Sequence, residues 1–455
     1  MTRIASIIIL ALLFLSLFAF TFTLQTARAQ GTIYINPNGR ITPSNANITT
    51  SDNVTYTFNG SNYLPIVVNR SNIIINGMGH TLQALGGYAF YLSGVNNVTI
   101  KNTTIANSSV GIHLESSSNC TVTGNNMTNN TDGIELFNGI GNNVSGNILT
   151  ACSEDGIDLN VASGNVLSGN KVTASEVGYG IGLSSSSGNI LSRNNVTANK
   201  YGFYLASSSG SVLSGNTVAA NTYGIYLSAS SSNNTLSGSN VTANSAEGVD
   251  LYDSSGNTIS GNTVTANNYG IELFDSCANN TLSGNNVTAN EEHGIILYSS
   301  CDNNTLSGNT LTADDYGVYL YVSCANNTLS SNNITANSDV GVYVYQSSGN
   351  RIFHNDFLNN VQQAIVSSSN NTWDNGYPSG GNYWSDYLTR YRNASEIDSS
   401  GIGNTYYVID ANNIDHYPFM NQIAVPEIQP SMLLPLFMTL TLLAVAIYRK
   451  RLTKT

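Results

Sequence analysis

The stretch NNTLSGNNVTAN, residues 279–290, decides the fold because the chain repeats it in register. NNTLSGNTLTAD follows at residue 303 and NNTLSSNNITAN at residue 326, so the copies start 24 and 23 residues apart. Looser copies extend back to NNVTIKNTTIAN at residue 96. A fixed period of this length is the signature of a repeat architecture, in which each unit stacks on the previous one.

A second marker, Gly-Ile-x-Leu, keeps the same period. It begins at eleven glycines that lie 22 to 24 residues apart: Gly111, Gly133, Gly156, Gly180, Gly202, Gly224, Gly248, Gly270, Gly294, Gly317 and Gly341. Ala89 and Ala364 extend the series by one step at each end. The runs between turns are rich in Val, Ile and Thr, which favour strands, and no run has the composition of a helix. A leucine-rich repeat is excluded because its helical half is missing, and we predict a right-handed parallel β-helix of about 12–13 coils of 22–24 residues.

An asparagine column supports stacked coils. Three residues after the hydrophobic centre of the NTLSG strand, asparagine recurs in nearly every unit, interrupted only by Lys101 and Ser239: Asn125, Asn147, Asn170, Asn194, Asn216, Asn262, Asn285, Asn309, Asn332 and Asn355. We expect these side-chain amides to stack along the axis, with left-handed backbone at a tight corner.

The two ends of the chain differ from the repeats. Arg3, the apolar run Ile7–Phe22 and Ala27-Arg28-Ala29 before Gln30 are typical of a signal peptide over residues 1–29. Residues 432–448 carry no charge and precede the basic residues of 449–455, which predicts a C-terminal transmembrane helix with a cytoplasmic tail. We therefore expect an exported protein held at the cell surface by a single-pass anchor.

The exposed strand edges of a solenoid need caps. Residues 30–64 and 367–424 break the period, so we assign them as N- and C-terminal caps around repeats 65–366, with a linker at 425–431. Both tryptophans, Trp373 and Trp384, fall in the second cap, where they suit a lid over an open hydrophobic core.

The net charge of the whole chain is −12, and 27 acidic residues outnumber 15 basic ones. Six of the basic residues lie in 1–29 and 449–455, so the predicted exported part is still more acidic. Such a surface repels nucleic acid, and we expect no nucleic-acid partner. Several N-x-S/T sequons could carry glycans in a suitable host, for example Asn47, Asn53, Asn97, Asn195 and Asn286.

Specific segments resemble the NosD-like parallel β-helix family over about residues 31–421. They are NIIINGMGHTLQ at residue 72, WDNGYPSGGNYWSDY at 373, GIGNTYYVID at 401 and YPFM at 417. The resemblance is to archaeal surface members, and it implies a β-helix, overlap with carbohydrate-binding proteins and sugar hydrolases, and a link to copper-site maturation. Relatives often have an acidic, calcium-like run before YYVID. Residues 396–404 have fewer carboxylates, so we expect no calcium there.

The x residues of Gly-Ile-x-Leu point outward, because side chains alternate along a strand. This outer column reads Tyr91, His113, Glu135, Asp158, Gly182, Tyr204, Tyr226, Asp250, Glu272, Ile296, Tyr319 and Tyr343. Two residues further on, the last five coils give an aromatic column: Tyr252, Phe274, Tyr298, Tyr321 and Tyr345. We predict that these rings stack against the sugars of a polysaccharide or cell-surface glycan while Asp250 and Glu272 accept hydroxyl hydrogen bonds. The alternative is that the rings only stabilise neighbouring strands.

Stacked acids leave an enzyme as a second hypothesis. Asp132, Glu135, Asp155 and Asp158 form one group on adjacent coils, and Asp250, Asp253, Glu272 and Asp275 form another. A carboxylate pair about 5 Å apart would suit a retaining glycoside hydrolase, and four such oxygens could instead hold calcium. We assign no catalytic residue, because stacked acids on a repeat are more often a solvated face. A polyuronate lyase is less favoured, because the basic residues of the coils are scattered.

Copper handling is the third hypothesis. Copper prefers clustered His, Met and Cys, but the five histidines are dispersed and only Met78 and His80 are close in sequence. We therefore predict no metal ligands and no cofactor.

Three of the five cysteines share one column. Cys277, Cys301 and Cys324 lie 24 and 23 residues apart, which places them on successive coils. We favour buried stacked thiols, because adjacent parallel strands rarely aim their Cβ atoms for a disulfide, although the strand spacing permits one.

Overall fold

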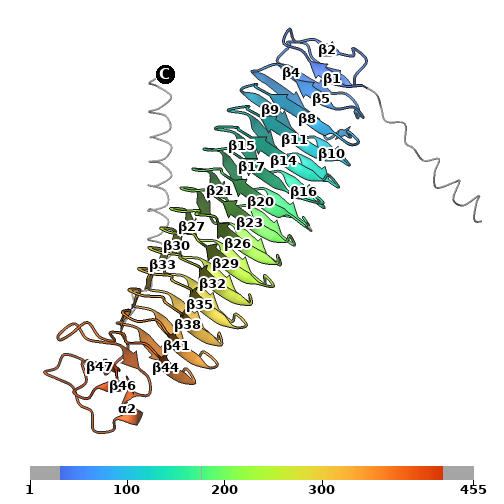
Figure 1. Ribbon diagram of the computed structural model, residues 1–455. Helices are drawn as coiled ribbons and strands as arrows, with labels where there is room; N and C mark the ends of the chain where they lie inside the picture. Colours follow the sequence, from blue (N-terminus) through green and yellow to red (C-terminus); the bar gives the residue numbers. More distant parts are fainter. Residues whose placement is uncertain (1–30, 176, 424–455) are drawn as a thin grey trace, which may run out of the picture.

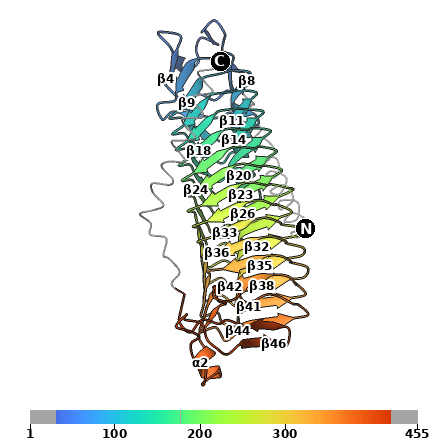
Figure 2. The same cartoon turned by 90° about the vertical axis from the view of Figure 1, so that its left-hand side faces the viewer.

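The computed structural model describes residues 31–175 and 177–423. Within them the chain is an all-β parallel solenoid of the right-handed type with about 14 turns. The turns stack along a rod (Figure 1), and Figure 2 shows the same rod from the side. The predicted all-β solenoid is thus confirmed. Residues 1–30 and 424–455, which include the predicted signal peptide and transmembrane helix, lie outside the described residues.

Sheet A carries the Gly-Ile-x-Leu motifs and has 16 strands in the described ranges. In spatial order they are β2 (Ile41–Thr42), β1 (Ile33–Ile35), β5 (Ile66–Val68), β8 (Tyr88–Ser93), β11 (Val110–Glu115), β14 (Asp132–Phe137), β17 (Ile157–Asn160), β20 (Tyr179–Ser184), β23 (Tyr201–Ala206), β26 (Tyr223–Ser228), β29 (Glu247–Tyr252), β32 (Tyr269–Phe274), β35 (His293–Tyr298), β38 (Tyr316–Tyr321), β41 (Val340–Tyr345) and β44 (Gln362–Ser367).

Sheet B contains the NTLSG strands. They are β3 (Ile48–Thr49), β4 (Thr55–Phe58), β6 (Ile73–Asn76), β9 (Val98–Lys101), β12 (Thr121–Thr123), β15 (Asn143–Ser145), β18 (Val166–Ser168), β21 (Ile190–Ser192), β24 (Val212–Ser214), β27 (Thr235–Ser237), β30 (Thr258–Ser260), β33 (Thr281–Ser283), β36 (Thr305–Ser307), β39 (Thr328–Ser330) and β42 (Arg351–Phe353).

Sheet C contains the NVTAN strands. They are β7 (Thr81–Leu82), β10 (Thr104–Ala106), β13 (Asn126–Thr128), β16 (Ile148–Thr150), β19 (Lys171–Thr173), β22 (Asn195–Thr197), β25 (Thr217–Ala219), β28 (Asn240–Thr242), β31 (Thr263–Thr265), β34 (Asn286–Thr288), β37 (Thr310–Thr312), β40 (Asn333–Thr335), β43 (Asp356–Leu358) and β45 (Tyr383–Trp384). The quoted stretch 279–290 is therefore β33, a corner and β34.

Equal positions in the repeat lie directly above one another. On sheet A, for example, Phe274 pairs with Tyr298, and Tyr298 pairs with Tyr321. The Ile and Leu of each Gly-Ile-x-Leu point inward, as Ile271 and Leu273 show with no exposed surface. This stack of aliphatic side chains forms one continuous core along the rod.

Close packing between successive coils explains why each motif begins with glycine. A Cβ built on Gly270 would lie 2.4 Å from the carbonyl oxygen of Gly294 and 2.6 Å from Cγ1 of Val287. Those distances are too short for any side chain, so the close approach of successive coils requires glycine. This requirement accounts for the regular recurrence of glycine in the sequence.

The predicted asparagine ladder is present and buried. The backbone N–H and the side-chain Nδ2 of Asn285 both donate to Oδ1 of Asn309 at 3.0 Å, and Nδ2 also donates to the carbonyl of Ile259. Two further ladders, not predicted, run through Asn280 and Asn290 at the other corners. Each ladder satisfies backbone groups that the corner would otherwise leave unpaired.

The expectation of left-handed backbone at the ladder asparagines is wrong. The left-handed residue is the one before each of them, for example Gly284 with φ +61° and Ser331 with φ +58°. The asparagine itself turns its side chain into the coil, where the amide bonds to the next turn.

The period-breaking ends contribute coils of their own. In the N-terminal segment, β1 and β4 pair in parallel with β5 and β6, and β45 extends sheet C at the other end. The expected 12–13 coils are therefore too few, because non-repetitive residues add turns that carry no sequence period.

The C-terminal end closes over the core with aromatic side chains. It contains helix α2 (Tyr387–Arg390) and the hairpin β46 (Tyr407–Asp410) and β47 (Asn413–Asp415). The buried indole of Trp384 stacks between Phe357 at 4.3 Å and Tyr407 at 4.1 Å, and its N–H donates to Asp415. Among the described residues, no helix has the length and apolarity to cross a membrane.

The cysteine column is buried as predicted. All five cysteines are buried free thiols, and Cys277, Cys301 and Cys324 lie on successive coils with no exposed surface. Each of these three thiols donates to a backbone carbonyl of the preceding coil, for Cys277 that of Leu251.

Candidate functional site

The predicted aromatic column runs along the outer face of sheet A. Its rings are half-buried, and neighbouring centroids lie 4.9–5.4 Å apart along Tyr252, Phe274, Tyr298, Tyr321 and Tyr345. The rings of Phe274 and Tyr298 are parallel to within 7°. Two of the four neighbouring pairs are stacked and two are tilted, and in all of them the adjacent rings cover much of each face. The rings therefore offer mainly edges and phenolic hydroxyls to a ligand. The structure thus places all five residues together but leaves little room for a sugar between them.

The column of x residues lies beside it, in the register that the sequence predicts. Tyr319 and Tyr343 stack at 4.9 Å with an angle of 3°. Tyr319 also contacts Tyr321 edge-on at 5.2 Å, so the two columns touch.

A third outer column consists of the residues directly before each motif glycine, and sequence reasoning missed it. In a regular strand, residues three apart face opposite sides. Here the glycine and the following residue are both buried, so the residue before the glycine comes back to the outer face. The rings of Tyr201 and Tyr204 are accordingly 5.4 Å apart. The sequence signal that could have revealed this column is the aromatic or acidic residue that recurs directly before the motif glycine.

Together the three columns divide the face into alternating aromatic and acidic groups on the strands of sheet A from β8 to β41. Figure 1 shows the order of these strands along the rod. The first aromatic group is Tyr88, Tyr91 and His113. The second is Tyr179, Tyr201, Tyr204, Tyr223 and Tyr226. The third contains the predicted column with Tyr269, His293, Tyr316, Tyr319 and Tyr343.

The first acidic group lies between the first two aromatic groups and has internal partners. Oδ1 of Asp132 accepts the Asp155 N–H at 3.0 Å, and Oδ1 of Asp155 accepts the Tyr179 N–H at 2.7 Å. Glu135 contacts Nδ1 of His113 at 2.6 Å and pairs across the sheet with Asp158. Burial raises the pKa of Asp132 to about 6 and that of Asp158 to about 7.

The second acidic group separates the second and third aromatic groups. It consists of Glu247, Asp250 and Glu272, and one carboxylate oxygen of each lies within 4.8 Å of the others. Asp250 is only 7% exposed. Burial, with the neighbouring Glu247, raises the pKa of Glu272 to about 7, and burial with the nearby Glu272 raises the pKa of Asp250 well above its usual value.

The second predicted acidic set is brought together only in part. Asp250 and Glu272 are directly paired, but Asp253 and Asp275 have φ of +45° and +55° and lie at the corner after β29 and β32. There Asp253 is exposed and accepts the Ser230 hydroxyl at 3.3 Å. Glu247 completes the group instead, because Gly248 brings it to the outer face.

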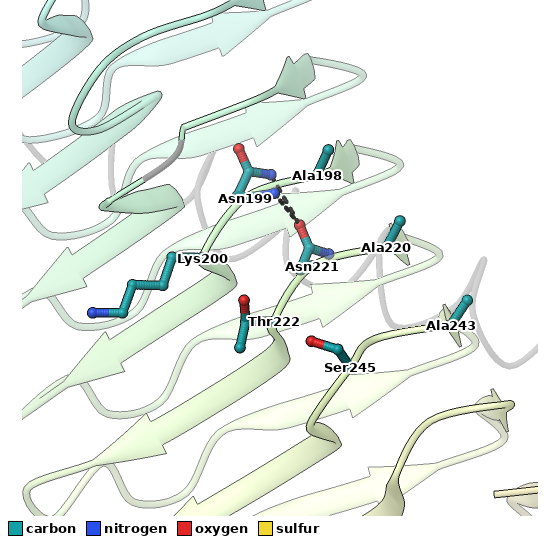
Figure 3. A pocket seen from close by; sticks show the side chains of 8 residues that line it. All are labelled: Ala198, Asn199, Lys200, Ala220, Asn221, Thr222, Ala243 and Ser245. Atoms are coloured by element: carbon teal, nitrogen blue, oxygen red, sulfur yellow. Dashed lines mark hydrogen bonds between the residues drawn. The ribbon is translucent and has the colours of Figure 1, made fainter. Parts of the chain in front are cut away.

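Two shallow hollows border sheet A. One, of about 420 Å³, lies at the corner after sheet C (Figure 3), where small alanines such as Ala220 leave space beside the hydrogen-bonded Asn199 and Asn221. The other, of about 440 Å³, is at the N-terminal end of sheet A and is lined by Thr32, Pro65, Val67, Gly87, Tyr88, Tyr91, His113 and Glu115. The second hollow continues the aromatic face onto the first coils.

One family of proteins matches most of the chain. The family described as periplasmic copper-binding protein (NosD) matches residues 22–238, 177–282 and 230–389. Among the curated proteins, none matches this sequence.

Three solved structures illustrate a similar chain path, and each has low sequence identity to this chain. The periplasmic alginate epimerase AlgG is 15% identical over 71% of this chain and 80% of its own, with a TM-score of 0.40. The Dettilon tailspike protein gp208 is 16% identical over 74% of this chain and 69% of its own, with a TM-score of 0.41. DFA-IIIase of Arthrobacter chlorophenolicus A6 without its lid is 14% identical over 61% of this chain and 82% of its own, with a TM-score of 0.44.

Proposed function

This chain belongs to the NosD family of β-helix proteins, and we propose that the outer face of its sheet A binds an extended glycan. The observation that carries the proposal is the alternation of half-buried aromatic groups and acidic groups along one face of the rod. A linear polymer aligned with the axis would meet one side chain of each column at every turn, about 4.8 Å apart, and would pass from aromatic to acidic groups along the rod.

The contacts would be made through edges and oxygens. The rings of Phe274 and Tyr298 stack, and the ring of Tyr321 lies 5.1 Å from that of Tyr298 at an angle of 36°. Neighbouring rings therefore cover much of each face, and the edges are left for the CH groups of a sugar. The phenolic hydroxyls donate and accept, and half-buried carboxylates such as Glu272 accept from sugar hydroxyls. This differs from the expected stacking of sugars on ring faces, because those faces are already covered.

Polysaccharide binding by the full chain tests the proposal. The double change Tyr298→Ala with Tyr321→Ala should weaken binding at least tenfold, whereas Tyr298→Phe with Tyr321→Phe keeps the stack and isolates the hydroxyl contribution. Tyr406→Ala is the matched control, because Tyr406 is 53% exposed and belongs to none of the three columns. Unchanged binding by the first double variant would refute the proposal.

A polysaccharide-active enzyme is the second candidate. The observation in its favour is the close carboxyl pair of Asp250 and Glu272, one of which has its pKa raised to about 7. A retaining glycoside hydrolase needs such a pair about 5 Å apart. Glycan binding is preferred because Asp250, at 7% exposure, has almost no surface with which to reach a glycosidic bond. Release of reducing sugar that is lost in Glu272→Gln would reverse this preference.

Copper binding, which the family description suggests, does not fit the described residues. Copper sites gather His, Met or Cys. In residues 31–175 and 177–423, the group of three His, Cys, Asp or Glu ligand atoms within 4.8 Å of one another is made of carboxylates alone. His113 and His293 are on separate coils, and the column thiols are buried.

Export and surface attachment complete the proposal. They are supported by the sequence pattern of residues 1–29 and 432–448. Extraction of the full chain with the membrane fraction, and release of a fragment by external protease, would test them.

A further inference from the structure

Three carboxyl groups of sheet A converge although they come from two strands. Asp250 on β29 and Glu272 on β32 occupy paired positions. Glu247, at the start of β29, reaches the same face because Gly248 and Val249 are both turned inward. One oxygen of each group lies within 4.8 Å of the other two.

Two carboxylate oxygens of these three residues have no hydrogen-bond partner. Oδ1 of Asp250 and Oε2 of Glu247 are fully covered and receive no N–H or O–H from any described residue. The Asp250 side chain belongs to a residue that is 7% exposed. A buried, unpartnered carboxylate is costly, so this arrangement calls for a ligand that compensates it.

No basic side chain supplies that compensation within the described part of the chain. The ion pairs there join His113 to Glu135 and His416 to Asp374, far from this group in the fold. The first acidic group differs, because its carboxylates have partners. Asp132 and Asp155 each accept a hydrogen bond from a backbone N–H, and Glu135 contacts His113. Only the second group therefore combines crowding, burial and unpartnered oxygens.

We propose that Glu247, Asp250 and Glu272 bind a divalent cation of the calcium class. Calcium binds oxygen ligands at about 2.3–2.6 Å, so the oxygens around one ion lie at most about 5 Å apart, and the three oxygens of this group meet that limit. Magnesium needs a stricter octahedron and usually keeps several waters beside one or two carboxylates, so it suits a group of three carboxylates less well. Soft metals are disfavoured because all three donors are carboxylate oxygens.

The site is open to solvent on one side. Glu247 and Glu272 are half-buried and form the outer side of the site, where water can complete the shell. The inference goes beyond glycan binding, and its test contains no glycan, so the two stand or fall separately.

Terbium luminescence and calcium titration of the full chain test the site. Tyr226 pairs directly with Asp250, and tyrosines excite bound terbium when they lie close to it. We expect terbium emission that calcium displaces, with one site per chain and a dissociation constant for calcium below about 1 mM, the range of extracellular modules. Asp250→Asn and Glu272→Gln should each weaken calcium binding at least tenfold.

Asp275→Asn is the matched control, because it removes the same charge from the neighbouring corner and should leave calcium binding unchanged. Circular dichroism shows whether each variant keeps the β-structure of the unaltered chain. Asp250→Asn is expected to stay folded, because it removes an unpartnered charge. Absence of calcium binding by the unaltered chain would overturn the proposal. Equal calcium binding by Asp250→Asn would overturn it too, because the ion would then lie elsewhere.

Discussion

Asp250 and Glu272 occupy paired positions on neighbouring strands of sheet A, and Tyr226 pairs with Asp250 on the strand before. Among the described residues, no basic side chain forms an ion pair with either carboxylate. In a solenoid, one turn sets the neighbours of the next, so two acids in consecutive units must be adjacent. The repeat itself therefore places these two carboxyl groups next to each other, and their interaction should affect the stability of the fold.

Stability should fall as pH rises when divalent ions are removed. The pKa of Asp132 is raised to about 6 and those of Asp158 and Glu272 to about 7. Between about pH 4 and 7 the folded chain therefore binds more protons than the unfolded chain, so the free energy of unfolding decreases with pH and then levels off. We expect a decrease of several kcal/mol, since one pKa unit corresponds to about 1.4 kcal/mol and the pKa of each of these three groups is raised by more than one unit.

Urea unfolding with chelator at pH 4.5 and pH 8 measures this decrease. Glu272→Gln should reduce it, because the variant no longer titrates there. The tyrosines that face the group, Tyr223, Tyr226 and Tyr269, stay neutral over this range because burial raises the pKa of each. Stability that increases steadily from pH 4.5 to 8 would contradict the assignment.

Loss of one ladder asparagine should be costly. Asn285→Ala removes an amide that donates to Ile259 and Asn309 and accepts from Asn262, all buried. We expect a loss of about 2–3 kcal/mol, because buried backbone groups lose their partners. Asn286→Ala next to it is the control, since Asn286 is exposed, and its effect should stay within about 0.5 kcal/mol. Chemical denaturation of both variants makes the comparison, and equal effects would show that the ladder contributes little.

A methyl group on a motif glycine should disturb the coil spacing. In Gly270→Ala the added Cβ would approach the carbonyl of Gly294 to 2.4 Å, so neighbouring coils must separate. The expected loss is about 1–3 kcal/mol, as for other overpacked sites. Gly87→Ala provides the control, because nothing lies within 4 Å of its added Cβ. Thermal unfolding distinguishes the two, and a neutral Gly270→Ala would show that the coils can adapt.

Much of this fold could be predicted from the spacing of the repeats. Gly270 and Ile271 recur in register, and the alternation of a strand then assigns Leu273 inward and Glu272 outward, as the structure has them. The Asn285 ladder followed from the same counting. The coils formed by β1 and β4 could not be predicted in this way, because their residues do not follow the repeat and join the sheets through tertiary contacts.

The candidate site was only partly predictable for a geometric reason. Strict alternation places Glu247 and Tyr201 on the inner face, because each is three residues from an outward side chain. The irregularity at the motif glycine reverses this, and it becomes visible only in the paired strands. The missing partner of Asp250 is likewise a property of packing, since it depends on every group around that oxygen.

Hydroxyl-radical footprinting of the full chain with a bound polysaccharide tests the glycan-binding claim most directly, because it reports which rings the ligand covers. Tyr298, Tyr321 and Tyr345 should lose at least half of their oxidation when the glycan is present, while Tyr406, exposed in the C-terminal segment, keeps its own. A polysaccharide that binds and leaves the oxidation of those three rings unchanged would contradict the assignment of sheet A as the binding face.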